Sequence, residues 1–209
     1  MDYPEGVNLS ELLGIKIADK NREVIGSLSD VVFSLEKPIE ITKFIAGGTA
    51  LEEFLEKIKL KTDRDPVFNA ADIRSFTKSS IFLNKTHNRL KEAEEQENTE
   101  TRPEIRFTQL MKTKVIGKND QKVGNIIDVH FDHDSVQFIL GGGFFRDLID
   151  NIGLVNQDEF LIREEDIIQF SNGLLKISKS KTDLEKVISK HKDHTDDHLA
   201  NFEDAEFAL

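Results

Sequence analysis

The sequence contains no cysteine and no tryptophan, and it has a single tyrosine. Without cysteine the chain has no disulfide, no catalytic thiol and no zinc site built on thiolates. No apolar run approaches the roughly 20 residues that a membrane-spanning helix needs, and the first residues lack the basic and apolar regions of a signal peptide. We therefore expect a cytoplasmic protein without direct membrane insertion.

Basic residues are also scarce. Lysine and arginine number 28 against 39 acidic residues, which gives a formal charge of -11 over 209 residues. The averaged field of such a chain repels phosphate backbones, so the sequence predicts no nucleic-acid partner. The hydrophobic content of 38% is typical of a folded chain that buries a core.

The chain contains an internal duplication, which is the strongest signal in the sequence. Residues 9–33 align without a gap on residues 107–131, at an offset of 98. After a four-residue deletion in the second copy, the register continues at an offset of 94. Identical pairs include Leu12/Leu110, Gly26/Gly124, Asp30/Asp128, Phe33/Phe131, Phe44/Phe138, Gly47/Gly141, Gly48/Gly142, Asp72/Asp166 and Phe76/Phe170.

Each copy reads as a β-meander with one helix. In the first copy, branched residues predict strands over 15–18 and 31–35 around a turn at 19–23, and another strand over 39–46. Gly26 and Gly124 fall inside strands and indicate a bulge or tight bend. Gly47-Gly48 and Gly141-Gly142 predict sharp turns into helices. The apolar spacing predicts those helices over 51–58 and 145–152. Short strands over 65–69, 73–76 and 80–83 complete the copy.

These features divide the chain into four parts: a first domain over 1–84, a polar linker over 85–104, a second domain over 105–180 and a helical, acidic tail over 181–209. In the tail, Thr182 and Glu185 fit a capping box. Leu184, Val187 and Ile188 then form the apolar stripe of a short docking helix.

The order of the motifs resembles the PRC-barrel family. The shared points are a glycine in the second strand, an aspartate shortly before an aromatic, and an Asp-Ile pair before the final hairpin, as at Gly26, Asp30, Phe33 and Asp72-Ile73. Many family members carry proline and acidic residues before that pair, where this chain has Asn-Ala-Ala and Arg-Glu-Glu. The resemblance implies a mainly β fold with minor α content, with two tandem small barrels that bind proteins and do not catalyse.

Two clusters of histidine and aspartate are candidate metal sites. The sequence HFDHD over 130–134 contains His130, Asp132, His133 and Asp134, and strand alternation places Asp128, His130 and Asp132 on one face. In the tail, His191, His194 and His198 recur at helical spacing. Asp128 corresponds to Asp30 in the first copy, whereas the histidines have no counterpart there. We therefore favour a structural role for the strand residues and a solvated helix end for the tail histidines. Gly141-Gly142-Gly143 lacks the following Gly-Lys-Ser/Thr of a phosphate loop. We expect no metal, no cofactor and no catalytic residue.

Candidate partner contacts lie where the copies differ. Phe144 replaces Ala50 beside the predicted helix stripe, and Phe202 and Phe207 stand in the acidic tail. For Phe144, local repacking of the second core is an equal alternative.

The leading hypothesis is a non-enzymatic adaptor that binds a protein partner or itself. Stand-alone archaeal adaptors are the nearest PRC-barrel relatives by the absence of other domains, so the resemblance points to an archaeal cell-division or membrane-associated assembly. The alternatives are a ribosome-maturation or RNA-associated factor, and third a metal-dependent enzyme.

Overall fold

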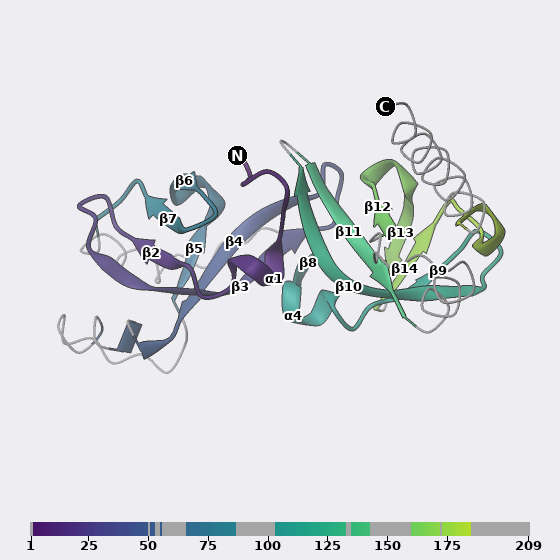
Figure 1. The fold of residues 1–209 in the computed structure, drawn as a ribbon, viewed down its shortest axis with the longest axis horizontal. Coiled ribbons are helices and arrows are strands. Elements are labelled where there is room, and N and C mark those ends of the chain that lie inside the picture. The colour runs from purple at the N-terminus through teal and green to yellow at the C-terminus, as the bar shows by residue number, and fades with distance from the viewer. Residues whose placement is uncertain are drawn as a thin grey trace, which may run out of the picture.

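The computed structural model describes residues 2–49, 51–52, 55, 66–86, 103–132, 135–142, 160–171 and 173–184. Two seven-stranded sheets lie side by side, and the long central strands of each run toward the junction between them (Figure 1). The predicted fold class, mainly β with a few short helices in two barrel-like units, is confirmed. No helix among the described residues is both long and apolar enough to cross a membrane.

The two sheets have the same strand order. The first runs β5-β4-β3-β2-β7-β6 and the second β12-β11-β10-β9-β14-β13, and the β2–β7 and β9–β14 pairs are the parallel ones. The strands of the first sheet are β2 (Lys16–Ala18), β3 (Val24–Ser34), β4 (Glu40–Gly47), β5 (Val67–Asn69), β6 (Ile73–Phe76) and β7 (Ser80–Leu83). Those of the second are β9 (Lys114–Ile116), β10 (Lys122–Asp132), β11 (Ser135–Gly141), β12 (Phe160–Ile162), β13 (Ile167–Ser171) and β14 (Leu174–Ile177).

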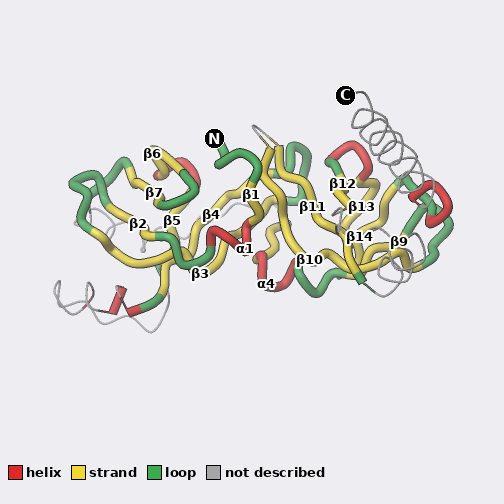
Figure 2. The backbone as a smooth tube through the Cα atoms, in the orientation of Figure 1, coloured by secondary structure: helices red, strands yellow, loops and turns green. Residues whose placement is uncertain are grey.

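The remaining elements are short. They are β1 (Val7–Asn8), α1 (Leu9–Leu12), β8 (Glu104–Arg106), α4 (Phe107–Leu110) and the 3-10 turns η1 (Ala70–Asp72) and η2 (Glu164–Asp166). In Figure 2 the helical turns α1 and α4 both lie where the two halves of the molecule meet. Each follows a two- or three-residue strand, so β1-α1 and β8-α4 are equivalent segments of the two copies.

These two segments are exchanged between the copies. β1 pairs with β10 of the second copy, with Val7 opposite Phe131, while β8 pairs with β3 of the first copy, with Ile105 opposite Phe33. Both pairs obey the 98-residue offset. Each sheet therefore includes one strand that the predicted domain division assigns to the other half of the chain or to the linker. The buried residues of both copies also form one hydrophobic cluster.

The second strand of each copy is longer than the sequence indicates. β3 runs without a break from Val24 to Ser34, so it joins the strand expected around Gly26 to the run predicted over 31–35, and it pairs with both β2 and β4. Register shifts occur opposite Ile17-Ala18 and between Leu28 and Asp30. Each shift moves the inward face by one residue. The two-residue alternation that marks a strand in sequence is broken at these shifts, so the sequence did not show that β3 is one continuous strand.

The last described residues, 181–184, form a helical turn whose cap differs from the predicted one. The Ser180 hydroxyl accepts a hydrogen bond from the Asp183 amide at 3.2 Å, and the Ser180 amide donates to the Asp183 carboxylate at 2.8 Å. The capping box is thus Ser180–Asp183 and not Thr182–Glu185, because the helix begins two residues earlier. These bonds and the Lys118 ammonium hold the pKa of Asp183 well below its usual range. Leu184 is fully buried as expected, whereas Val187 and Ile188 lie outside the described residues.

Thr113 offers a test of packing at the end of α4. Its hydroxyl is buried without a hydrogen-bond partner among the described residues, and its counterpart in the first copy is Ile15. A buried hydroxyl without a partner costs about 1–3 kcal/mol. We therefore expect Thr113→Val to raise the free energy of unfolding by about 1 kcal/mol, measured by urea denaturation. Thr113→Ser, which keeps the hydroxyl and loses the methyl group, should instead lower it.

Candidate functional site

The junction between the two copies is held by a matched pair of carboxylate clamps. Asp128 on β10 accepts hydrogen bonds from the Ser10 amide at 3.2 Å and from the Ser10 hydroxyl at the start of α1. Asp30 on β3 accepts from the Thr108 amide at 3.4 Å and from the Thr108 hydroxyl at 2.8 Å, at the start of α4. Each carboxylate is almost fully buried and binds the exchanged helical turn of the other copy.

Each aspartate also accepts a hydrogen bond from the amide of the residue that follows it, Val31 at 2.9 Å and Val129 at 2.7 Å. Both carboxylates are thus fixed by three donors, two of them across the exchange. A carboxylate at the first turn of a helix also interacts favourably with its exposed amides. The repeated aspartates therefore hold the copies together.

An aromatic stack crosses the same junction. The ring of Tyr3, in the N-terminal segment, lies parallel to the ring of Phe131 on β10, with centroids 5.0 Å apart. Phe131 in turn meets Phe76 on β6 of the first copy edge to face at 5.9 Å. Phe131 has no exposed surface, so this ring of the second copy is packed between two parts of the first.

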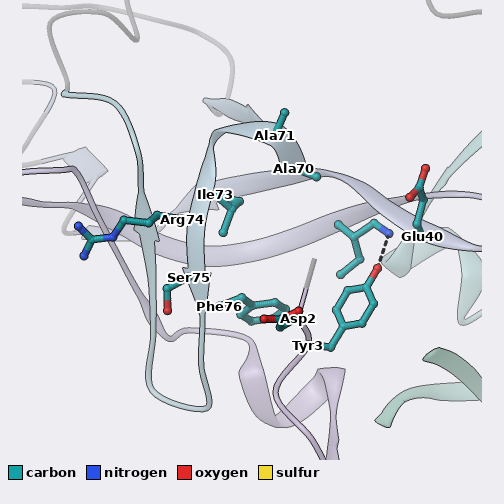
Figure 3. Close-up of a pocket in the computed structure, with 10 residues that line it drawn as sticks. Asp2, Tyr3, Glu40, Ala70, Ala71, Ile73, Arg74, Ser75 and Phe76 are labelled. Carbon is teal, nitrogen blue, oxygen red and sulfur yellow. Dashed lines mark hydrogen bonds between the residues drawn. The ribbon is translucent and has the colours of Figure 1, made fainter. Parts of the chain in front are cut away.

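A cavity of about 530 Å³ opens beside this stack. Tyr3 and Phe76 line one side in Figure 3, and the small side chains of η1, Ala70 and Ala71, lie on the opposite side. The second copy has Glu164 and Glu165 in place of these two alanines, and Glu164 accepts a hydrogen bond from the Ile39 amide at 3.0 Å. The two copies therefore differ at this turn, with small side chains at η1 and carboxylates at η2.

Carboxylates give the cavity a polar edge. Asp2 lies next to the Phe76 ring, and Glu40 stands at the far side of the Tyr3 hydroxyl (Figure 3). The Tyr3 hydroxyl accepts a hydrogen bond from the Ile41 amide at 3.2 Å. Arg74, the basic residue of the lining, points away from the other labelled side chains, and its guanidinium lies 5.7 Å from the centroid of the Phe82 ring. The cavity therefore combines aromatic rings with negative charge.

Burial raises the pKa of Tyr3 above its ordinary value of 10.0; the Ile41 hydrogen bond opposes this rise and the Glu40 carboxylate adds to it. A raised pKa means that the fold favours the neutral phenol. Its contribution to stability is fully present below pH 10 and is lost as the pH rises through the raised pKa. Tyr3 is the sole tyrosine, so its ultraviolet absorbance should titrate above the midpoint of a tyrosine peptide. Denaturant should restore the ordinary midpoint.

The HFDHD cluster forms no metal site among the described residues. Asp128 is used in the clamp, the His130 Nδ1 atom lies 2.8 Å from the Asn8 side-chain oxygen on β1, and Asp132 accepts a hydrogen bond from Gln137. No group of three or more metal-ligating side chains occurs in the described ranges. His133, Asp134, Gly143 and the tail histidines His191, His194 and His198 lie outside them.

The three predicted partner contacts, Phe144, Phe202 and Phe207, also lie outside the described residues and remain predictions. The repeated glycines are described. A Cβ atom on Gly26 would lie 3.3 Å from the Cβ of Ala46, and one on Gly47 would lie 3.0 Å from that of Ser29. On Gly141 it would lie 2.7 Å from Ile127, the counterpart of Ser29. Gly48 and Gly142 have positive φ angles of 84° and 123°, and Gly124 pairs with Val115 beside a register shift.

The cavity was not predicted from the sequence. Its residues come from the N-terminal segment and from β4, η1 and β6 of the first copy, which are distant in sequence and meet only in the folded chain. The available signal was Tyr3, the one tyrosine, placed just before the first repeat.

Comparisons with known proteins give little beyond this geometry. No protein-family model matches the sequence, and no curated protein does. Among solved structures, the chain matches a crystal structure described as the 16S ribosomal RNA processing protein RimM of Pseudomonas aeruginosa. The identity is 11% and the TM-score 0.27, over 82% of this chain and 98% of that chain. The match is compatible with a PRC-barrel fold, and at this TM-score it assigns no function.

Two expectations change. The exclusion of nucleic acid as a partner is withdrawn: the protein of the matched structure is described as a 16S ribosomal RNA processing protein. Net charge averages over the whole molecule and does not exclude a local contact. An archaeal origin and a role in cell division have no support from the comparisons.

Proposed function

We propose that this chain is a non-enzymatic binding factor that docks on a protein component of an RNA–protein assembly, as a ribosome-maturation factor would. The observation that carries the proposal is the junction: the repeated carboxylates Asp30 and Asp128 interlock two barrels, and a cavity with aromatic rings and acidic edges opens beside it. Two barrels held in a fixed arrangement can bind a partner protein, and binding requires no catalytic side chain.

The charge of the chain is complementary to the protein component of such an assembly. Proteins that neutralise RNA phosphates carry lysine and arginine, so a chain with a formal charge of -11 is complementary to such proteins. At the cavity, the rings of Tyr3 and Phe76 with the carboxylates of Asp2 and Glu40 fit a lysine or arginine side chain. A cation over an aromatic ring gains about 0.5–2 kcal/mol, more when water is excluded.

The ribosomal setting comes from the description of RimM, and co-sedimentation tests it. The chain should co-sediment with small ribosomal subunits of its source organism, and a parallel sample of protein-free ribosomal RNA shows whether the contact is with protein or with RNA. The double variant Asp2→Asn/Glu40→Gln should bind the subunits at least about tenfold more weakly. Asp120→Asn is the matched control, because Asp120 is an exposed carboxylate on a turn of the second copy.

Three other outcomes of the co-sedimentation experiment would change the proposal. Binding to protein-free ribosomal RNA that weakens steeply with salt would make RNA itself the partner. No binding to either sample would remove the ribosomal setting. Equal binding by the double variant and the Asp120→Asn control would move the contact away from the cavity.

A further inference from the structure

The edge of β10 that receives β1 is a complete peptide-binding site. It supplies strand pairing to Val7 and Asn8, and the Gly6 amide donates to the Phe131 carbonyl at 2.9 Å. It also supplies the Asp128 clamp for Ser10. Leu9 and Leu12 of α1 have essentially no exposed surface. Backbone pairing and side-chain burial together are how an added strand is recognised at a sheet edge.

The segment is joined to its own barrel through one residue in an unusual conformation. Gly14 has a φ of +88°, and a Cβ added there would meet no atom within 4 Å. Its counterpart in the second copy is Lys112, which has no positive φ. The N-terminal segment is thus connected by a glycine hinge directly after α1, whereas the equivalent segment of the second copy is not.

We infer that the β10 edge also binds residues 5–13 of a second copy of this chain, in a two-fold dimer that exchanges these segments between molecules. Every contact of the segment with β10 would be kept, because the β10 edge is the same in both molecules of the dimer. The conformation at Gly14 and the protein concentration then decide between the monomer and the exchanged dimer. This interaction goes beyond the proposed function and does not depend on the identity of the partner.

Cysteine trapping tests the exchange directly, because the chain has no cysteine of its own. Asn8 and His130 lie opposite each other in the β1–β10 pair. We expect full-length Asn8→Cys and His130→Cys variants, mixed at high concentration and oxidised, to form a disulfide-linked heterodimer on a non-reducing gel. The control mixture of Asn8→Cys with Val32→Cys should not form it, because Val32 pairs with Arg106.

The hinge gives a second, independent readout. Gly14→Val strains the backbone only while the hinge is bent, so it should raise the ratio of dimer to monomer by about tenfold, measured by size-exclusion chromatography with light scattering. Gly6→Val is the matched control. Gly6 has a φ of +66° with no atom near an added Cβ, but it lies inside the docked segment, so its strain is the same in both forms.

Absence of the heterodimer in the trapping mixture, with the Gly14→Val chain folded and monomeric, would overturn the inference. So would equal dimer formation by Gly6→Val and Gly14→Val, which would indicate association of destabilised chains. If Gly14→Val does not fold, the trapping experiment decides alone, since it uses the native hinge.

Discussion

Replacing Phe131 with alanine is expected to lower the free energy of unfolding by about 3–5 kcal/mol and to release the N-terminal segment. The ring is fully buried and contacts both Tyr3 and Phe76, which belong to the other copy. Truncation therefore leaves a void between the copies as well as within the second core. The stability change is measured by urea denaturation.

The release of the segment has its own signal, because Tyr3 is the sole tyrosine and the chain lacks tryptophan. In Phe131→Ala, iodide should quench the Tyr3 fluorescence nearly as well as in a free peptide. Val136→Ala is the control, since Val136 lies opposite Phe131 on β11 and is buried. It should lower stability by about 1–3 kcal/mol while Tyr3 stays protected. Equal protection of Tyr3 in both variants would contradict the role given to the stack.

Replacing Asp128 with alanine is expected to cost about 3 kcal/mol of stability, because it leaves the Ser10 amide, the Ser10 hydroxyl and the Val129 amide without their acceptor. Asp128→Asn keeps one side-chain oxygen and should cost less. Since the bonds to Ser10 cross between the copies, loss of the clamp should also expose Tyr3 to iodide.

A double-mutant cycle separates the clamp from other effects. Ser10→Ala and Asp128→Ala should show a coupling energy of about 1–2 kcal/mol, and Thr108→Ala with Asp30→Ala should show the same. The mismatched pair, Ser10→Ala with Asp30→Ala, should be additive within about 0.5 kcal/mol, because no hydrogen bond joins those residues. Coupling in the mismatched cycle and none in the matched cycles would exclude the exchanged arrangement.

Local features followed closely from the sequence. The tight turn at 19–23 is present: the Asp19 amide donates to the Glu23 carbonyl at 2.9 Å, and Arg22 takes a φ of +68°. The strand predicted over 39–46 is observed as β4 (Glu40–Gly47). Such elements depend on the chemistry of neighbouring residues. The continuity of β3 was not predicted because its bulges break the two-residue period that identifies a strand.

The presence of two copies of one mainly β unit follows from the sequence alone, because the 98-residue offset identifies equivalent residues, among them Asp30 and Asp128. Which aspartate each helical turn meets follows only from the folded arrangement of the two copies. Because the copies present nearly the same acceptor edge, β1 could pair with β3 or β10 by local chemistry alone. The choice depends on the path of the chain through Gly14 and on Tyr3 reaching Phe131, which are long-range geometric facts. The N-terminal segment also lines the cavity, through Asp2 and Tyr3.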